Sequence, residues 1–340
     1  MKAVVKLEKG ASKIEYREWE KPVPGPGQVL LKVKAVGICG TDIHILHDRF
    51  PTTPPLILGH EFSGEVAAIG SGVSGWKIGD RVVAENITGA CGSCDLCRTG
   101  HAHLCPQKKA YGSRSHGAMA DWTVMPAHAL HRIPDGVSHE EAAVVEPLAI
   151  ATHAVLQRGN VRLDQKVVII GPGPIGLLAI LVAKSAGANV AMVGTSEDNA
   201  RLAKARELGA DLVLEAGPNI SSLLNSWKPD RAIHCVVELS GSSSGIQHAI
   251  QWVGRGQCIA AVGLAGKEVL VPWDEAVVKG VDIRFCFSSS YQAWEQALAL
   301  LASRQVSPAS IITHRFPLPQ WREAFDAVEK KEAIKCLLIP

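Results

Sequence analysis

The sequence of 340 residues has no strong excess of charge, no long apolar run and no low-complexity tract. Its formal net charge is only +2, and no basic run is interleaved with aromatic residues, so nucleic acid and anionic membranes are poor candidate partners. No apolar stretch approaches the roughly 18 residues of a membrane-spanning helix. The N-terminal stretch alternates apolar and charged residues and lacks the apolar centre of a signal peptide, so we expect a cytoplasmic protein.

The composition is that of a well-packed folded protein, with 47% hydrophobic and 20% charged residues. Because 340 residues exceed one ordinary core, two domains of about 150 residues each are expected. Without a secretory signal, the nine cysteines indicate a reducing compartment, where clustered thiols bind metal rather than form disulfides. Four of them lie in apolar surroundings and are expected to be buried and inert: Cys235, Cys258, Cys286 and Cys336.

The pattern of apolar residues changes near residue 160. Residues 1 to about 150 contain short strand-like runs broken by Gly and Pro, which predicts an irregular, mostly β domain. Beyond it, short apolar runs alternate with helix-like stretches, which predicts βαβ units with right-handed crossovers in a doubly wound parallel sheet. Those runs occupy 166–171, 189–194, 211–216, 234–241 and 257–263. Two helices and a last strand are expected after residue 285.

Four cysteines lie within fifteen residues, at Cys91, Cys94, Cys97 and Cys105. Two consecutive C-x-x-C steps and a fourth cysteine eight residues on let four thiolates surround one tetrahedral zinc ion. Such a site has no open position, so the zinc would stabilise the loop and do no chemistry. The alternatives are half-buried thiols, a redox pair or a nucleic-acid zinc ribbon, and the near-zero net charge argues against the last.

A glycine-rich turn of the form G-x-G-x-x-G follows the apolar run KVVII and opens the helix-like stretch IGLLAILVAKSAG. In that context glycines allow backbone to approach a pyrophosphate, and the helix N-terminus offers free N–H groups. We therefore expect a dinucleotide site. The residues assigned to it are Gly171, Gly173, Pro174, Ile175, Gly176, Thr195, Ser196, Arg201 and Val262.

The end of the second strand of that unit bears on the choice between NAD and NADP. An NAD site usually places Asp or Glu there, but this chain has Thr195 and Ser196, with Arg201 one turn later. Small hydroxyl residues beside an arginine suit a 2′-phosphate, so NADP is favoured. Alternatively Ser196 caps the next helix, and Glu197 would then be the candidate for an NAD ribose.

A second metal site is indicated by Cys39 and His60, which could supply a thiolate and an imidazole. A catalytic zinc needs three protein ligands and one open position for substrate or water. A carboxylate would complete the set.

The quoted motifs, with CGTDIH, LGHEFSGEVAAIG, GDRV and VEPLAIATHA, occur in an order that resembles the zinc-containing medium-chain dehydrogenase/reductase family. The resemblance covers nearly the whole chain and is strongest to the branch of sorbitol (polyol) and threonine 3-dehydrogenases. It implies a GroES-like catalytic domain at 1–150 with a structural zinc lobe at about 88–106, a Rossmann domain at 151–286 and a returning C-terminal segment at 287–340. It also implies zinc in the cleft between the domains and a homo-oligomer, with a tetramer favoured over a dimer.

The resemblance also implies residue roles. Glu146 of VEPL stands where alcohol dehydrogenases carry a second cysteine ligand, and Glu61 is the other carboxylate near the metal. The two could exchange as ligands, or one could act through water. Thr41 would share the proton of the substrate hydroxyl, and His44 would pass it toward solvent. Cys39, Thr41 and His44 are thereby assigned, with His60, to the catalytic centre.

The function predicted is hydride transfer between a secondary alcohol or polyol, or the matching ketone, and NADP or NAD, with two zinc ions per chain. The Arg-Tyr pair typical of polyol dehydrogenases is missing: Phe287-Ser288-Ser289-Ser290-Tyr291 occupies that region, and Arg284 falls earlier. A sorbitol-like substrate is therefore in doubt. The alternatives are oxidation of an amino alcohol, as in threonine 3-dehydrogenases, and a non-catalytic member that binds zinc and cofactor.

Overall fold

The structure is a computed structural model of the chain and describes residues 1–10 and 13–340. These residues form two compact units. One consists of Met1–Glu146 together with Ser290–Pro340, and the other of Pro147–Ser289. Among the described residues, none of the helices combines the length and the apolar character needed to cross a membrane.

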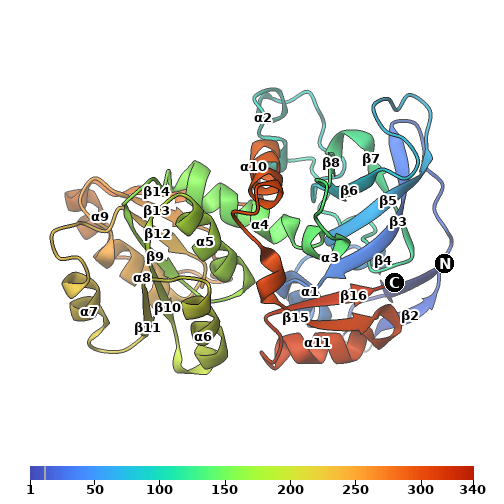
Figure 1. Ribbon diagram of the computed structural model, residues 1–340. Coiled ribbons are helices and arrows are strands. Elements are labelled where there is room, and N and C mark those ends of the chain that lie inside the picture. The colour runs from blue at the N-terminus through green and yellow to red at the C-terminus, as the bar shows by residue number, and fades with distance from the viewer. Residues whose placement is uncertain (11–12) are drawn as a thin grey trace. The chain divides into compact units, whose positions relative to one another are not determined.

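The first unit is built on two sheets (Figure 1). The smaller is antiparallel, in the order β2 (Ile14–Glu18), β1 (Lys2–Lys6), β4 (Leu56–Ile57). The larger runs in the order β15 (Ile312–Pro317), β16 (Lys335–Ile339), β3 (Gln28–Gly37), β5 (Glu61–Ile69), β6 (Arg81–Ala84), β8 (Leu130–Arg132), with β7 (Trp122–Pro126) also on β3. Its helices are α1 (Gly40–Leu46), α2 (Asp95–Arg98), α3 (His139–Ala142), α10 (Tyr291–Ala302) and α11 (Trp321–Glu329). Helix α4 (Val145–Thr152) contains the point where the two units divide.

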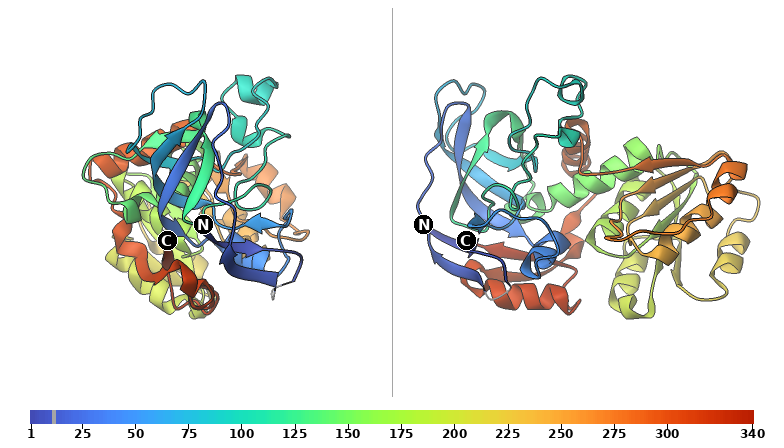
Figure 2. Two further views of the ribbon diagram at one scale, coloured as in Figure 1. Left: turned by 90° about the vertical axis from the view of Figure 1, so that its right-hand side faces the viewer. Right: turned by 180° about the vertical axis from the view of Figure 1, so that it is seen from behind.

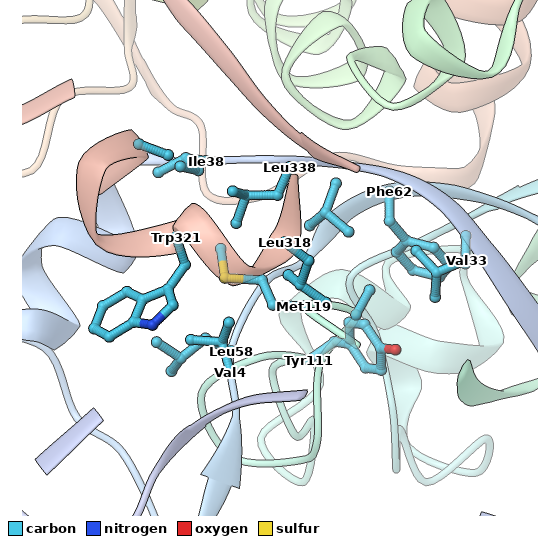
Figure 3. Packing of buried hydrophobic residues seen from close by; sticks show 14 of the residues in the cluster. Val4, Val33, Ile38, Leu58, Phe62, Tyr111, Met119, Leu318, Trp321 and Leu338 are labelled. Carbon is cyan, nitrogen blue, oxygen red and sulfur yellow. The ribbon is translucent and has the colours of Figure 1, made fainter. Parts of the chain in front are cut away.

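The C-terminal segment completes the core of this first unit. Strand β16 pairs antiparallel with β3 and parallel with β15, so the end of the chain lies beside its beginning (Figure 2). Figure 3 shows Trp321 and Leu338 from the C-terminal segment packed with Val4, Leu58 and Met119 from the N-terminal part. All five side chains are at most 5% exposed, so residues more than 200 positions apart share one apolar cluster.

The second unit is a six-stranded, wholly parallel sheet with α5 and α6 on one face and α7, α8 and α9 on the other (Figure 1). Its strand order is β11 (Leu212–Glu215), β10 (Asn189–Gly194), β9 (Lys166–Ile170), β12 (Cys235–Glu238), β13 (Cys258–Ala261), β14 (Asp282–Phe285). Its helices are α5 (Pro174–Ser185), α6 (Asn199–Glu207), α7 (Ile220–Ser226), α8 (Ser243–Trp252) and α9 (Trp273–Lys279). The order is that of a dinucleotide-binding fold, in which ligands bind at the carboxyl ends of the strands.

The predicted doubly wound parallel sheet is confirmed. Every residue of β9 is buried, which explains why the four residues after Lys166, VVII, are a continuous apolar run rather than an alternating one. Strand β14 was not predicted. Its four residues, DIRF, are exposed or half-buried, because it lies at the edge of the sheet and needs no continuous apolar run.

Candidate functional site

The first metal cluster begins where β3 ends and α1 starts. Cys39 precedes α1 in an extended conformation, and its backbone N–H donates to Asp42 Oδ2 at 2.9 Å. The fully buried Asp42 side chain therefore fixes the start of the helix and with it the position of the Cys39 thiol. Glu61 is the first residue of β5 and His60 directly precedes it; β5 pairs with β3, and Gly37 of β3 lies opposite Glu61.

Ligand atoms of Cys39, His60 and Glu61 all lie within 4.8 Å of one another. His60 and Glu61 are 5% and 1% exposed, whereas Cys39 is partly accessible. A Cβ on Gly37 would collide with the Glu61 carboxylate, so glycine at 37 provides the room that this side chain needs. A thiolate, an imidazole and a carboxylate form a donor set that suits zinc.

The surroundings of His60 also suit a cation. Asp42 Oδ1 lies 3.9 Å from His60 Nδ1 and is a buried oxygen without a hydrogen-bond partner among the described atoms. Burial disfavours the charged ring, yet the nearby Cys39, Asp42 and Glu146 outweigh it and raise the pKa of His60 well above its usual value. A carboxylate on the far side of a metal-binding histidine commonly orients the ring. The sequence analysis did not assign Asp42, although its place three residues after Cys39 was visible.

Glu146 lies near this cluster, on α4, but is not one of the three residues whose ligand atoms meet. Its side chain is 5% exposed. Burial, reinforced by the charge of Glu61 and opposed by His60 and Lys335, raises the pKa of Glu146 to about 7. The structure thus brings Glu61 into the cluster and holds Glu146 beside it as a second buried carboxyl group.

Lys335 of β16 is a further member of the site that the sequence analysis missed. Its ammonium donates to Glu61 Oε2 at 2.7 Å, to Glu61 Oε1 at 3.0 Å and to the carbonyl of Ile38 at 3.0 Å. Both side chains of the pair are almost completely buried, at 2% and 1% exposure. No local signal could have identified it, because a lysine in the run AIKCLLI looks like an ordinary strand residue.

The two predicted relay residues lie on α1. The Thr41 hydroxyl oxygen accepts a hydrogen bond from the Cys39 thiol, with 3.6 Å between sulfur and oxygen. His44 lies one turn later and is exposed at the surface of the unit. Partial burial and the neighbouring Arg49 and His47 lower the pKa of His44, so its ring stays neutral at a lower pH than an ordinary histidine.

The four cysteines of the 88–106 lobe converge in space. The sulfur–sulfur distances are 3.7 Å for Cys91–Cys105, 3.9 Å for Cys94–Cys105 and 4.0 Å for Cys91–Cys97. A tetrahedral ion with Zn–S bonds of about 2.3 Å requires sulfurs about 3.8 Å apart. Hydrogen bonds from Ser93 and from the Cys94 amide lower the pKa of Cys91 to about 5, so this thiol is readily ionised. Burial raises the pKa of Cys97 to about 12, so the charges of the four thiols do not all point one way, but the sulfur geometry fits a four-thiolate zinc site.

The glycine turn connects β9 to α5. Gly171 has φ = +105°, a conformation that L side chains rarely adopt, and a Cβ on Gly176 would collide with the Gly171 carbonyl. At Gly173, which precedes Pro174 at the start of α5, an added Cβ would meet no atom within 4 Å. The turn is thus tight on its inner side and open on its outer side, as a pyrophosphate cradle must be. Ile175 follows in the first turn of α5, and Val262, just after β13, donates its N–H to the Glu238 carbonyl at 2.9 Å.

The three residues assigned to a 2′-phosphate pocket differ in their surroundings. Thr195 donates its backbone N–H and its hydroxyl to Asp198 Oδ2, at 3.0 and 2.8 Å, and so serves as a local cap. Ser196 is exposed. Arg201 is half-buried, its Nη1 lies 4.0 Å from Asp198 Oδ1, and its buried Nε–H has no hydrogen-bond partner among the described atoms.

Arg284 is engaged in contacts within the second unit. Its guanidinium donates to Asp282 Oδ2 at 2.7 Å through Nε and to the Arg158 carbonyl at 2.7 Å through Nη1. These contacts tie β14 to the end of the helical segment His153–Arg158, which is a structural role.

Comparison with known proteins agrees with this geometry. Residues 25–135 match the alcohol dehydrogenase GroES-like domain, and residues 174–303 match the zinc-binding dehydrogenase domain. The chain is 36% identical to sorbitol dehydrogenase of Halalkalibacterium halodurans, covering 100% of this chain and 99% of the relative. It is 34% identical to D-arabitol-phosphate dehydrogenase of Enterococcus avium, covering 99% and 97%.

An alcohol dehydrogenase of Escherichia coli CFT073, solved with NADH, superposes with a TM-score of 0.92 at 26% identity, covering 100% of this chain and 99% of the other. These matches confirm the predicted GroES-like domain, the zinc-binding character and the nicotinamide cofactor. The chain belongs to the zinc-containing medium-chain dehydrogenase family, in its sorbitol dehydrogenase-like branch, and is a zinc-dependent, NAD(P)-linked alcohol or polyol dehydrogenase.

Proposed function

We propose that the chain oxidises a secondary alcohol or polyol, or reduces the matching ketone, at the cluster of Cys39, His60 and Glu61. The observation that carries this proposal is the convergence of these three different ligand types within 4.8 Å, beside the relay residue Thr41. When bound, zinc supplies a Lewis acid that makes the substrate hydroxyl more acidic, and the nicotinamide accepts the hydride.

The chain's own residues hold the substrate and move its proton. Thr41 can accept the hydroxyl proton and donate its own, because a hydroxyl group is both donor and acceptor. His44, neutral at working pH because its pKa is lowered, takes the proton to solvent. Asp42, whose Oδ1 lies 3.9 Å from His60 Nδ1, is proposed to favour the orientation of the His60 ring through its charge.

The carboxylate ligand is either Glu61 or Glu146. The position in the family pattern favours Glu146, whereas the distances support Glu61, whose oxygen lies within 4.8 Å of the Cys39 and His60 ligand atoms. We propose Glu61 as the ligand in this arrangement, with Glu146 exchanging for it or acting through water. The carboxyl group of Glu146 has a pKa of about 7, and a cation bound nearby would favour its ionised form.

The four-thiolate lobe is proposed to hold a second, structural zinc ion. Its sulfur–sulfur distances of 3.7 to 4.0 Å support this, and four protein ligands leave no position for substrate. The ion's role is to fold a loop that contains only the short helix α2 and one 3₁₀ turn at Ala102–Leu104.

NADP is proposed as the preferred cofactor. The exposed Ser196 at the end of β10 leaves room for a 2′-phosphate, and the buried Nε–H of Arg201 lacks an acceptor. Thr195 contributes less than the sequence suggested, because Asp198 already accepts from its hydroxyl.

We also propose a homo-oligomer, with the tetramer favoured by the family resemblance. Among the described residues, β14 pairs only with β13, and large apolar side chains on or beside it are exposed: Leu264 (73%), Trp273 (65%) and Phe285 (76%). A second copy related by a two-fold axis could pair its own β14 there. Sedimentation analysis measures the resulting mass.

The test of the proposed function is a screen of secondary alcohols and polyols with NAD and NADP, following the reduced nicotinamide. It is run on protein of known zinc content. Turnover should require zinc and a secondary hydroxyl, and Cys39→Ser should abolish it while the four-thiolate ion is retained. Full activity in a chain that holds a single zinc ion would contradict the two-site assignment.

A further inference from the structure

Two lysines of the first unit are almost completely buried: Lys6 on β1 is 0% exposed and Lys335 on β16 is 1% exposed. They hold opposite ends of the segment 38–48, which carries Cys39, Thr41 and His44. Lys335 donates to the carbonyl of Ile38 before the helix. Lys6 donates to the carbonyl of Ile45 in the last turn of α1, at 2.9 Å, and contacts Asp48 Oδ1 at 2.8 Å.

Burying an ammonium group is costly unless it is paired and hydrogen-bonded, so the contacts that Lys6 makes must offset the cost of its burial. The feature that it holds is the turn after α1. Asp48 has φ = +54°, which is unusual for a residue other than glycine, and its Oδ2 also accepts from the Gly10 amide at 2.6 Å. Two contacts from the N-terminal part of the chain thus fix Asp48 in a strained conformation.

That turn determines the position of His44. Helix α1 has seven residues and could not be stable alone, so its last turn depends on tertiary contacts. Arg49, which directly follows Asp48, donates its backbone N–H to the His44 carbonyl at 2.8 Å. Displacement of Asp48 would therefore move the backbone contact that holds His44.

We propose that Lys6 is a positioning residue of the proton relay, acting on His44 through Ile45 and Asp48; the inference rests on the proposed function. The charged or titratable groups that face His44 are Arg49 and His47, and those that face Asp48 are Lys6 and Lys9. Without the Lys6 contacts, the last turn of α1 and the backbone of His44 are held less firmly. The hydroxyl proton must then leave directly to solvent or to a buffer base.

The test is Lys6→Met in the zinc-loaded enzyme, with kcat and KM measured from pH 6 to about pH 9.5. We expect kcat near pH 7 to fall roughly tenfold, a part of what general base catalysis contributes, while KM changes less than about twofold. The deficit should close at alkaline pH, where hydroxide accepts the proton, and on addition of imidazole as an external base. His44→Ala should show the same profile, and the double variant should lose nothing further.

Hydrogen exchange gives a readout that does not depend on turnover. The Arg49 amide should exchange faster in Lys6→Met than in the parent, because its acceptor, the His44 carbonyl, is less well held. Asp48→Asn provides a second route if Lys6→Met does not fold, since asparagine has nearly the same shape, keeps an acceptor oxygen and tolerates the positive φ of this position. It should show the same shift in pH profile.

Lys166→Met is the matched control. Lys166 is also buried, at 2% exposure, but it lies in the second unit and its ammonium binds the carbonyls of Leu224 and Arg231. It should lower stability and leave the pH profile unchanged. If Lys6→Met and Asp48→Asn behave like this control, Lys6 is merely structural and the proposal is wrong. Absence of turnover in the unmodified enzyme would instead overturn the proposed function, and the relay with it.

Discussion

Replacing Lys335 by methionine should destabilise the metal-free protein by far more than an ordinary surface change. The ammonium makes two bonds to the Glu61 carboxylate and one to the Ile38 carbonyl, all in a region at most 2% exposed. Charge-assisted bonds contribute roughly 1.5–3 kcal/mol each, and removing one partner of a buried pair costs about 3–5 kcal/mol because the other charge stays uncompensated. We expect a loss of about 3–5 kcal/mol in the free energy of unfolding.

The loss should depend on what else neutralises Glu61. In the double variant Lys335→Met/Glu61→Gln no buried charge is left unpaired, so the loss should shrink to roughly 1–2 kcal/mol. Zinc bound beside Glu61 should likewise reduce the loss of stability caused by Lys335→Met, because the ion neutralises the Glu61 carboxylate. The pKa of Lys335 is raised, because Glu61 and Cys39 outweigh the burial that would lower it. The stability that Lys335 contributes is therefore complete below the ordinary lysine pKa. It is lost only as pH rises through the higher pKa that Lys335 has in the folded protein, so it does not vary with pH around neutrality.

Urea unfolding with and without a chelator measures these losses. The control is Lys34→Met, whose partner Glu65 lies 3.0 Å away on the neighbouring strand but with both side chains about one-third exposed, at 31% and 34%. That pair should contribute less than about 1 kcal/mol. The reasoning would be refuted if Lys335→Met lost no more than this control, or if the double variant lost as much as the single one.

Three further predictions concern the other parts of the site. The pKa of Glu146 is raised from 4.5 to about 7, so the folded protein keeps this proton when the unfolded chain has lost it. The metal-free protein should therefore lose roughly 3 kcal/mol of stability as pH rises from about 4.5, the pKa in the unfolded chain, to about 7, the pKa in the folded protein. Urea unfolding at a series of pH values measures this dependence, and Glu146→Gln should flatten it. Cys94→Ser should remove one zinc ion by metal analysis and open the 88–106 lobe to protease, and retention of two ions would contradict the assignment. Ser196→Asp should shift kcat/KM from NADP toward NAD by roughly ten- to hundredfold, and a parent enzyme that already prefers NAD would show the NADP proposal to be wrong.

The sequence by itself determined much of the fold and several of its motifs. Its apolar runs predicted five of the six strands of the parallel sheet, because a strand buried on both faces must be apolar throughout. The four clustered cysteines and the glycine turn were visible because their residues are close together in the chain. Strand β14 was not predicted from the sequence, because it lies at the edge of the sheet and has no continuous apolar run.

Only the tertiary structure decided which distant residues meet at the metal cluster. Lys335 lies 274 residues from Glu61 and Lys6 lies 39 residues from Ile45, and neither lysine has a local pattern that distinguishes it from a surface residue. Pairing of β16 with β3 carries Lys335 to the Ile38 carbonyl and the Glu61 carboxylate, where burial makes its charge necessary. A charge in water can be placed almost anywhere in a sequence, but a buried charge needs a partner that only folding brings within reach.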